Sequence, residues 1–503
     1  MQRSSQVCTA SPGAAFTVTD NASVCHHRRL GHREDEDFNA LFAIAFAQTL
    51  AYGLLLAREE ARKDIGFDAH NHINETAHPL LRATLRALML EEVRAELGPA
   101  LAVLLDTVNA EDPKLLVHTK GRDPILYFYE DFLKIFEEGL WKRFGVIYTP
   151  VEVVEYQVAA VQRALEAIGT DGLLDPKVLL LDPACGTGTY LIAAAEAAGE
   201  LAESRFGGAA AAGEVRSLTR RLYGLEIMVG PYAVAHYRLA RALKSIGAQP
   251  EKERLNIYLA DTLAPVGDEK KVDNPLGFMG KPIVEERTKA DEVKRDKPIL
   301  AIFGNPPYRR LRGGETYGLV GAWVADQLWP RYTEPVSQAG WAIELNTFPD
   351  LYKAFFAWSQ WKLFWRENAP KRGVLCLITN RTYLTGHPDA GIRLWLRREF
   401  DEIDILDLRG DLRGAKPAGV EFDENVFDVE VGVAIIVAWA TGAKKKGTPA
   451  QIRYSDVWAH GAFSSQEKAT LLRSATVDSN LLTFVAIDRG PLDDFRPHPF
   501  AFC

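Results

Sequence analysis

The chain has 503 residues, more than one simple domain needs, and about two or three domains are expected at roughly 150 residues each. Hydrophobic residues make up 47% and charged residues 25%, which excludes a disordered, fibrous or collagen-like chain. The net charge of −8 supplies no global positive field, so any contact with nucleic acid must use local basic patches. Five scattered cysteines without a C-x-x-C pair argue against a disulfide framework or a zinc ribbon and fit a reducing cytoplasm.

The first part of the chain divides into a polar tail and a helical segment. Residues 1–33 are polar and mixed, carry no secretory signal, and are expected to be disordered. Residues 34–144 show apolar side chains at helical spacing. Within them Leu41–Ala57 has no charge and approaches the ~20 residues that span a membrane. Its polar Gln48 and Thr49 favour a helix buried in a large soluble protein, so no membrane is expected.

From residue 145 short apolar runs alternate with amphipathic helices. Such alternation predicts βαβ units and a parallel sheet with helices on both faces. The seventh run follows the sixth without a helix, which predicts an antiparallel strand at the end of the sheet. The charged stretch 267–297 is expected to be a surface insertion, and the turn at 444–447 a domain boundary. The expected strands are Val178–Leu181, Leu222–Leu225, Asn256–Leu259, Ile299–Phe303, Val374–Ile378, Ile403–Leu408 and Val431–Val437, and the helices include Tyr190–Ser204, Pro231–Ile246, Leu351–Trp365 and Ile392–Phe400.

A glycine loop follows the first expected strand. Residues 182–188 read Asp-Pro-Ala-Cys-Gly-Thr-Gly and lead into a helix. Glycines at this place let the backbone approach a ligand closely, in the crevice where open sheets bind. A dinucleotide-binding loop is the competing interpretation, but the spacing is G-x-G-x-x-I, and there is no Gly-Lys-Ser/Thr for cradling phosphate.

A second loop follows the fourth expected strand and reads Gly304-Asn305-Pro306-Pro307-Tyr308. Two prolines form a rigid corner with few donors of its own. The Asn305 side-chain oxygen and the Pro306 carbonyl remain as acceptors beside the Tyr308 ring. Two acceptors next to a ring suit a planar group that carries an NH₂. The structural alternative is a Pro-Pro loop with asparagine as a turn former, but its place after a buried strand, downstream of the glycine loop, favours binding.

The order of these two loops resembles that of adenine-N6 DNA methyltransferases dependent on S-adenosyl-L-methionine (AdoMet). The resemblance covers residues 145–440 and implies an α/β fold, the class I (Rossmann-like) AdoMet-dependent methyltransferase fold, with a seven-stranded, mostly parallel sheet preceded by an α-helical domain. AdoMet is the implied cofactor, and no metal is implied. The implied catalytic residues are Asn305, Pro306, Pro307 and Tyr308.

The same resemblance implies a set of ligand-binding residues. Glu226 would accept hydrogen bonds from the ribose hydroxyls, Ile227 would flank the adenine ring, and Asp261 would lie near its amino group. Residues 351–365 and 373–380 resemble a helix and a strand beside the cofactor pocket. Tyr308 and Phe427 would stack on the target base. The full implied cofactor set is Tyr148, Thr149, Pro150, Asp182, Pro183, Ala184, Gly186, Gly188, Glu226, Ile227, Asp261 and Thr262.

Two basic clusters could contact DNA phosphates despite the negative net charge. One follows the second loop at Arg309, Arg310 and Arg312, and the other lies on one expected helix. Arg393 and Arg397 of that helix are four residues apart and share a face, with Arg398 beside them. An ordinary solvated surface is the alternative for both clusters.

A narrower resemblance covers the flanking regions. Residues 45–58 and 123–132 resemble the helical coupler of type ISP restriction–modification enzymes, and residues 452–458 resemble the start of their target-recognition region. The expected domains are a tail (1–33), a coupler-like domain (34–144), a methyltransferase (145–440) and a truncated start of the target-recognition region (441–503). Nuclease and helicase parts are absent, so restriction is not expected.

The resemblance implies a cytoplasmic, site-specific DNA methyltransferase of a restriction–modification or phage-defence system. It would transfer methyl from AdoMet to adenine N6 in double-stranded DNA, and a separate specificity, helicase or nuclease subunit stays open as a partner. A protein glutamine methyltransferase is an alternative, because the second loop could hold an amide NH₂ equally well. Methylation of cytosine N4 or of RNA would use similar acceptors. A non-catalytic AdoMet- and DNA-binding subunit, or a fragment of a larger restriction complex, is the alternative from another class.

Overall fold

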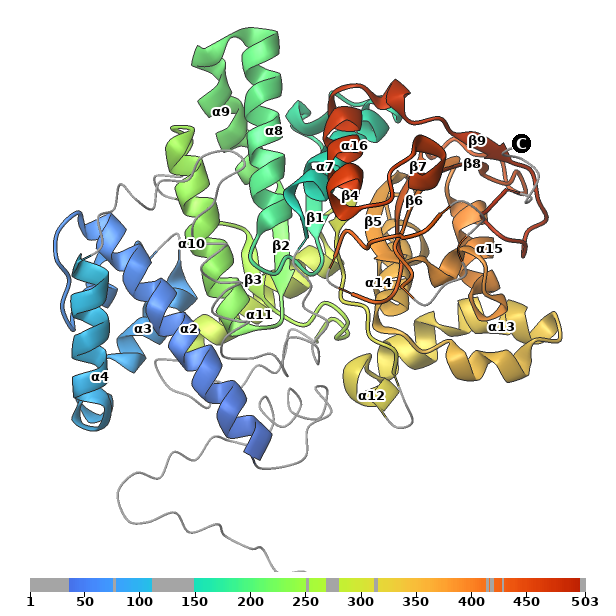
Figure 1. The fold of residues 1–503 in the computed structure, drawn as a ribbon. Helices are drawn as coiled ribbons and strands as arrows, with labels where there is room; N and C mark the ends of the chain where they lie inside the picture. Colours follow the sequence, from blue (N-terminus) through green and yellow to red (C-terminus); the bar gives the residue numbers. More distant parts are fainter. Residues whose placement is uncertain are drawn as a thin grey trace, which may run out of the picture.

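The computed structural model describes residues 36–75, 78–110, 149–249, 253–267, 280–311, 315–412, 416, 420–427 and 429–497. A nine-stranded sheet runs through it, in the order β3-β2-β1-β4-β5-β7-β6-β8-β9 (Figure 1). The strands are β1 Leu180–Asp182, β2 Leu222–Glu226, β3 Ile257–Leu259, β4 Ala301–Gly304, β5 Gly373–Asn380, β6 Glu402–Arg409, β7 Val433–Ala440, β8 Gln451–Asp456 and β9 Val485–Ile487.

Helices cover both faces of the sheet and bury an apolar core on each. In β5, Val374 and Cys376 point into one core while Leu375 and Leu377 point into the other, as the two-residue period of a strand requires. The described α-helices are α2 Glu36–Ala61, α3 Pro79–Leu88, α4 Glu91–Ala110, α7 Val151–Ala167, α8 Thr189–Phe206, α9 Gly208–Thr219, α10 Val229–Ser245, α11 Gly280–Arg295, α12 Glu315–Leu319, α13 Pro330–Gln338, α14 Leu351–Gln360, α15 Ala390–Glu399 and α16 Ser465–Val477.

The sheet contains a strand at each of the seven places where the sequence predicts one. β1 pairs in parallel with β2 and β4, and β4 with β5. β7 lies antiparallel between β5 and β6, so the predicted antiparallel orientation of the seventh strand is confirmed. Its predicted place at the end of the sheet is wrong, because β6, β8 and β9 continue the sheet beyond it.

The predicted strand count of seven is wrong, because two further strands follow residue 440. β8 pairs in parallel with β6, and β9 pairs antiparallel with β8. Between them α16 packs against α7, where Arg473 forms an ion pair with Glu152. Residues 451–487 thus extend the sheet past β6, and the assignment of 441–503 to a target-recognition region stays a prediction.

The expectation of a surface insertion at 267–297 is wrong for the part that the structure describes as α11. Ala290 and Val293 of this helix are buried in a core of the sheet. Glu286 is also buried and pairs with Arg254. The prediction failed because most residues of α11 are charged, although Ala290 and Val293 lie on its buried face. Residues 268–279 lie outside the described residues.

The N-terminal helices pack on the sheet domain through α10. Tyr52, Leu54 and Leu56 of α2 are buried in one cluster with Ala233 and Tyr237 of α10. Among the described residues no helix is long and apolar enough to cross a membrane. The 1–33 tail and the coupler-like 123–132 segment lie outside the described residues.

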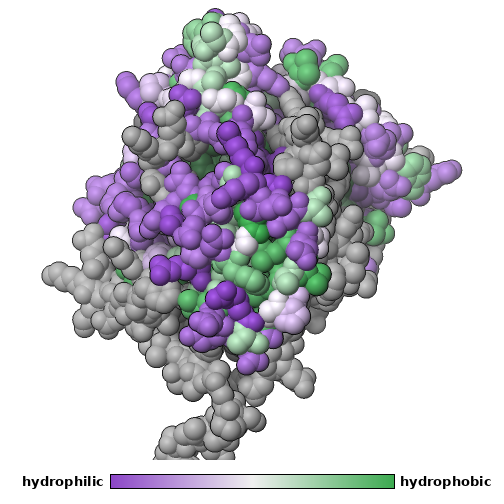
Figure 2. Space-filling view, turned by 90° about the vertical axis from the view of Figure 1, so that its left-hand side faces the viewer, coloured by the Kyte–Doolittle hydropathy of each residue, from purple (hydrophilic) through white to green (hydrophobic). Residues whose placement is uncertain are grey.

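The outer side of these helices carries an apolar area. Figure 2 looks at this side and shows apolar side chains gathered within a largely hydrophilic surface. On α4, which lies at the left edge of Figure 1, Leu97 and Val103 are exposed. Isolated exposed apolar residues are normal on a protein surface.

Arg393 and Arg397 do not form the phosphate-binding surface that the sequence predicts. Both side chains of α15 are buried, whereas Arg398 is exposed. Their guanidinium groups donate to backbone carbonyls and so fasten the segment 491–494 to α15. The accepting carbonyls belong to Tyr383, Gly386, Leu492 and Asp493 for Arg393, and to Pro491, Asp493 and Asp494 for Arg397.

Replacing Arg393 should therefore destabilise the fold. Arg393→Met leaves four bonds to backbone carbonyls unmade, one of them buried, and is expected to lower the free energy of unfolding by about 2–4 kcal/mol, read from urea denaturation. Arg398→Gln on the same helix, at an exposed position, should change it by less than about 1 kcal/mol. Equal midpoints for the two variants would show that the carbonyl contacts contribute nothing to stability.

Candidate active site

The glycine loop and the Asn-Pro-Pro-Tyr corner lie side by side because their strands are neighbours in the sheet. β1 and β4 pair in parallel with Leu180 opposite Ala301, so both loops leave the same edge. The contact is close: a Cβ built on Gly304 would lie 2.6 Å from Asp182 Oδ1. The structure thus brings the two predicted loops into one site.

The glycine loop adopts a backbone conformation that residues with a side chain rarely adopt. Gly186 and Gly188 have φ values of 53° and 82°, in the left-handed region. A Cβ on Gly188 would lie 3.2 Å from the Cβ of Ala235 in α10, so this glycine also permits close packing. A Cβ on Gly186 would meet nothing within 4 Å, which shows open space beside the loop.

Neighbouring strands hold the loop in place. The Cys185 amide donates to the Leu225 carbonyl of β2 at 3.0 Å. The Thr262 hydroxyl, after β3, donates to the Pro183 carbonyl. Cys185 is buried beneath the loop, and burial raises the pKa of its thiol well above its usual value. This cysteine is therefore a packing residue and no nucleophile.

Two buried carboxyl groups flank the loop. Glu226, at the end of β2, accepts from the Gly186 amide at 2.9 Å and from the Met228 amide at 2.7 Å. Asp182 accepts from the Ala184 amide at 3.0 Å. Burial raises the pKa of Glu226 to about 7 and that of Asp182 to about 8. Both groups therefore change charge near neutral pH.

The loop after β3 places Asp261 and Thr262 beside the glycine loop. Asp261 Oδ1 accepts from the Leu263 amide at 2.9 Å, and its carbonyl accepts from Lys294 Nζ at 2.6 Å. Arg238 of α10 reaches the other end of the glycine loop and donates to the Thr187 carbonyl at 2.7 Å. Sequence reasoning missed Lys294 and Arg238, because neither belongs to a motif.

The Asn-Pro-Pro-Tyr corner is held from two sides. Asn305 Nδ2 donates to Thr149 Oγ1 at 2.9 Å, just before Pro150, the N-cap of α7. Burial raises the pKa of Tyr308 far above its usual value. The Tyr308 ring is half-buried against both cores. Tyr148, the remaining residue of this predicted group, lies outside the described residues.

The chain after the corner is clamped to the start of α14. The Arg309 amide donates to Asp350 Oδ1 at 3.0 Å, and the Leu351 amide donates to the Arg309 carbonyl at 3.0 Å. Arg309 is half-buried and Arg310 is exposed, while Arg312 lies outside the described residues. The role of these arginines at DNA phosphates stays a prediction.

Phe427 lies in the loop between β6 and β7 and is only 6% exposed. Asn425 fixes its backbone: Asn425 Oδ1 accepts from the Phe427 amide, and Nδ2 donates to the carbonyls of Gly410 and Val431. In this conformation Phe427 is part of a core. Its predicted stacking on a target base would require the ring to be uncovered.

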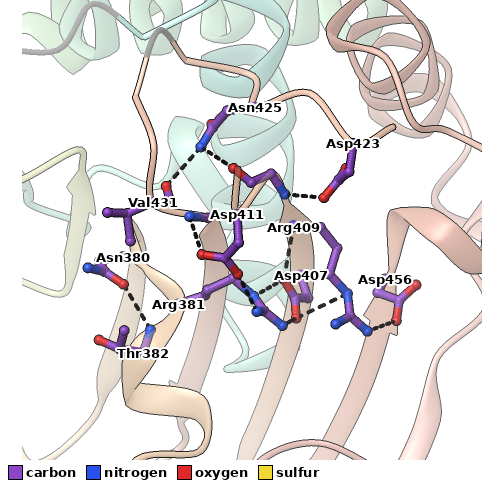
Figure 3. A network of polar contacts seen from close by, with 12 residues as sticks. Asn380, Arg381, Thr382, Asp407, Arg409, Asp411, Asp423, Asn425, Val431 and Asp456 are labelled. Carbon is purple, nitrogen blue, oxygen red and sulfur yellow. Dashed lines mark hydrogen bonds and ion pairs between the residues drawn. The ribbon is translucent and has the colours of Figure 1, made fainter. Parts of the chain in front are cut away.

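A polar network anchors the base of this loop (Figure 3). Arg381, directly after β5, donates to both carboxylate oxygens of Asp407 and to Asp411 at 2.6 Å. Arg409 binds Asp456 of β8, also at 2.6 Å. Burial alone would raise the pKa of Asp407, but Arg381 and Arg409 outweigh burial and hold it below its usual value. The network therefore joins β5, β6 and β8 at one edge of the sheet.

A comparison with known proteins finds a family model and solved structures to which this chain is similar. Residues 120–316 match the family model of the N-6 DNA Methylase. No curated protein matches the chain. Solved structures to which the chain is similar include three protein–DNA complexes, and the chain covers less than half of each protein. They are the ATP-dependent type ISP restriction–modification enzyme LlaBIII bound to DNA (TM-score 0.68, 21% identity, 93% of this chain and 29% of that one), a DrdV–DNA complex (0.67, 20%, 94% and 43%) and a nuclease-deletion mutant of the type ISP enzyme LlaGI with a DNA substrate mimic (0.64, 17%, 94% and 36%).

The close approach of Gly304 to Asp182 should not tolerate a side chain. Gly304→Ala places a Cβ 2.6 Å from Asp182 Oδ1 at a φ of 151°, so we expect a loss of about 1–3 kcal/mol in the free energy of unfolding. Gly213→Ala in α9 is the control, since its Cβ meets nothing within 4 Å, and it should be neutral or stabilising by up to about 1 kcal/mol. Urea denaturation of both variants tests this, and an unaffected Gly304→Ala would contradict the close contact.

Stability should also depend on pH through Glu226. Its pKa is about 7 in the folded chain against an ordinary 4.5, so between these values the folded state binds more protons than the unfolded state. The free energy of unfolding should therefore fall, by about 1–3 kcal/mol, as the pH rises through this window. Glu226→Gln should reduce the slope without abolishing it, because the raised pKa of Asp182 acts in the same pH range. Glu203→Gln, exposed on α8, should leave the slope unchanged. A wild-type slope in Glu226→Gln would contradict the assignment.

Proposed function

We propose, from the N-6 DNA methylase domain that this chain contains, that it transfers a methyl group from AdoMet to the N6 atom of adenine in DNA. The observation that carries the proposal is the contact between Asp182 and Gly304, which joins the glycine loop and the Asn-Pro-Pro-Tyr corner in one site. A methyl donor and an acceptor amine must meet, and this edge of the sheet provides a place for each.

The residues around the glycine loop fit AdoMet. The open space beside Gly186 admits the ligand, and a loop free of side chains at positions 186 and 188 allows close approach. Glu226 would accept hydrogen bonds from the ribose hydroxyls, and Asp261 would lie near the adenine amino group. AdoMet, when bound, supplies an electrophilic methyl group on a sulfonium.

The corner supplies what the amine needs. The exocyclic nitrogen of adenine is a poor nucleophile, because its lone pair is delocalised into the ring. Asn305 Oδ1 and the Pro306 carbonyl would each accept an N–H, free the lone pair, and stabilise the positive charge that develops on nitrogen. The proton leaves after the transfer, so no strong base is needed. Turning the target base out of the DNA helix costs a few kcal/mol, and stacking of the base on the Tyr308 ring would offset ~1–3 kcal/mol of this cost.

Partners and biological setting follow from the solved relatives. Two of those structures are type ISP restriction–modification enzymes, and all three hold DNA or a DNA substrate mimic. Double-stranded DNA is therefore the proposed substrate and a restriction–modification system the proposed setting. The chain spans under half of each, which keeps a separate specificity, helicase or nuclease subunit in the proposal. The match to a DNA methylase family favours DNA over a protein glutamine as the acceptor.

Transfer of tritiated methyl from AdoMet to unmethylated genomic DNA tests the proposal. We expect label in N6-methyladenine after digestion to nucleosides. Asn305→Ala should lower kcat by about 10²–10³ and leave the AdoMet Kd within about twofold, because it removes an acceptor used only by the amine. Asn346→Ala, at an exposed position, is the matched control and should retain full activity.

Four other outcomes would redirect the proposal. Label in methylcytosine would move the acceptor to cytosine N4, and label in added protein would support a glutamine methyltransferase. AdoMet binding without any label, with the neighbouring gene products present, would indicate a non-catalytic subunit. Full activity of Asn305→Ala would remove the asparagine from the mechanism.

A further inference from the structure

The two ends of the Asn305 side chain are chemically opposite. Oδ1 accepts hydrogen bonds and Nδ2 donates them, although the two atoms have nearly the same size. Rotating the amide by half a turn would present N–H groups to the N–H groups of the target amine. The proposed reaction therefore needs something that keeps the oxygen on the side of the substrate.

Thr149 binds the nitrogen end of the amide. Asn305 Nδ2 donates to Thr149 Oγ1 at 2.9 Å, and Thr149 is 7% exposed. A hydroxyl, however, can donate as well as accept, so this contact alone does not fix the amide. The direction of the threonine proton decides which amide atom it prefers.

Tyr190, at the start of α8, sets the direction of that proton. Its hydroxyl donates to Gln157 Oε1 at 2.6 Å and is hydrogen-bonded by the Thr149 side chain. Tyrosine has one hydroxyl proton, which is used on Gln157. Its oxygen can therefore only accept from Thr149, and the Thr149 lone pairs are turned toward Asn305.

Gln157 of α7 is itself held in one orientation. Its Nε2 lies 3.4 Å from the Cys376 carbonyl and 3.6 Å from the Cys376 thiol in β5, so Oε1 faces Tyr190. Gln157 and Cys376 are fully buried and Tyr190 is 4% exposed. Burial excludes water that could satisfy a reversed arrangement, and a reversed arrangement would leave buried groups unsatisfied.

We propose that Gln157, Tyr190 and Thr149 form a one-way hydrogen-bond relay that orients the Asn305 amide with Oδ1 toward the target amine. The relay rests on the proposed methyl transfer for its purpose, and its three members are positioning residues. Each donor points in the same direction, from Asn305 Nδ2 through Thr149 and Tyr190 to Gln157, and the β5 backbone ends the series.

This role is separable from the cofactor contact that the family resemblance implies for Thr149. A lost contact to AdoMet would raise the KM for AdoMet. A lost orientation of Asn305 would lower kcat and leave that KM unchanged, because the amide acts on the amine.

Kinetics of Thr149→Val, Thr149→Ser and Tyr190→Phe on DNA separate these cases. Thr149→Val and Tyr190→Phe should lower kcat by about ten- to hundredfold with the AdoMet KM unchanged, since misplaced catalytic groups cost rates of this order. A lower melting temperature is expected in both, because each leaves a polar group without its partner, so kinetics are measured below the unfolding transition. Thr149→Ser keeps the hydroxyl and should stay within about threefold of wild type. An increase of the AdoMet KM at constant kcat in Thr149→Val, or full activity of Tyr190→Phe, would overturn the relay.

A second measurement works without any methylation. In full-length protein labelled with ¹⁵N-asparagine, the Asn305 amide signal is the one missing from Asn305→Ser. Its side-chain protons should exchange with solvent at least about tenfold faster in Thr149→Val and Tyr190→Phe than in wild type or Thr149→Ser. Equal exchange in all four proteins would overturn the relay, whereas an inactive wild type with protected protons would overturn only the proposed function.

Discussion

The parallel pairing of β1 with β4 is the constraint on which the site depends. It sets two loops that are more than a hundred residues apart in sequence at one edge of the sheet, with Asp182 against Gly304. Neither loop could perform the proposed reaction alone, since one would hold the donor and the other the acceptor. Gly304 has no side chain, and this allows the two loops to lie in contact, since a Cβ at this position would clash with Asp182.

Burial around this contact has a second effect. The carboxyl groups that flank the glycine loop have little water to solvate their charge, and their pKa values rise to about 7 and 8. Donors from a bound ligand would compensate for the missing water and favour the ionised form. The pKa of Asp407 shifts in the opposite direction, because the guanidinium groups of Arg381 and Arg409 keep its carboxylate ionised. The carboxyl groups at the proposed ligand site therefore change protonation near neutral pH, whereas Asp407, which holds the chain in place, stays ionised.

Much of the fold could be predicted from the sequence, because parallel strands with both faces buried leave uninterrupted apolar runs. Seven strands, the antiparallel orientation of β7 and the two loops follow from such local patterns, but the place of β7 between β5 and β6 does not. β8 and β9 could not be predicted from them, since β8 alternates exposed and buried residues over only a few positions and β9 has three residues. The burial of Arg393 and Arg397 could not be predicted either, because most of the carbonyls that accept from them, those of residues 491–494, lie about a hundred residues away. The same reason applies to the site, where Thr149 and Asn305 stand out as motif residues. Gln157 and Lys294 belong to no motif, and their contacts with the site follow from the packing of α7 and α11.

The continuation of the sheet beyond β6 determines how far a fragment of this chain must extend to fold in isolation. Without residues 451–487 the backbone of β6 would lose its partner β8 and offer an open row of amides and carbonyls, the kind of edge that invites aggregation. Without the segment 491–494, two guanidinium groups inside α15 would lose most of their acceptors. A fragment expressed in isolation should therefore extend at least to residue 494, well past β7.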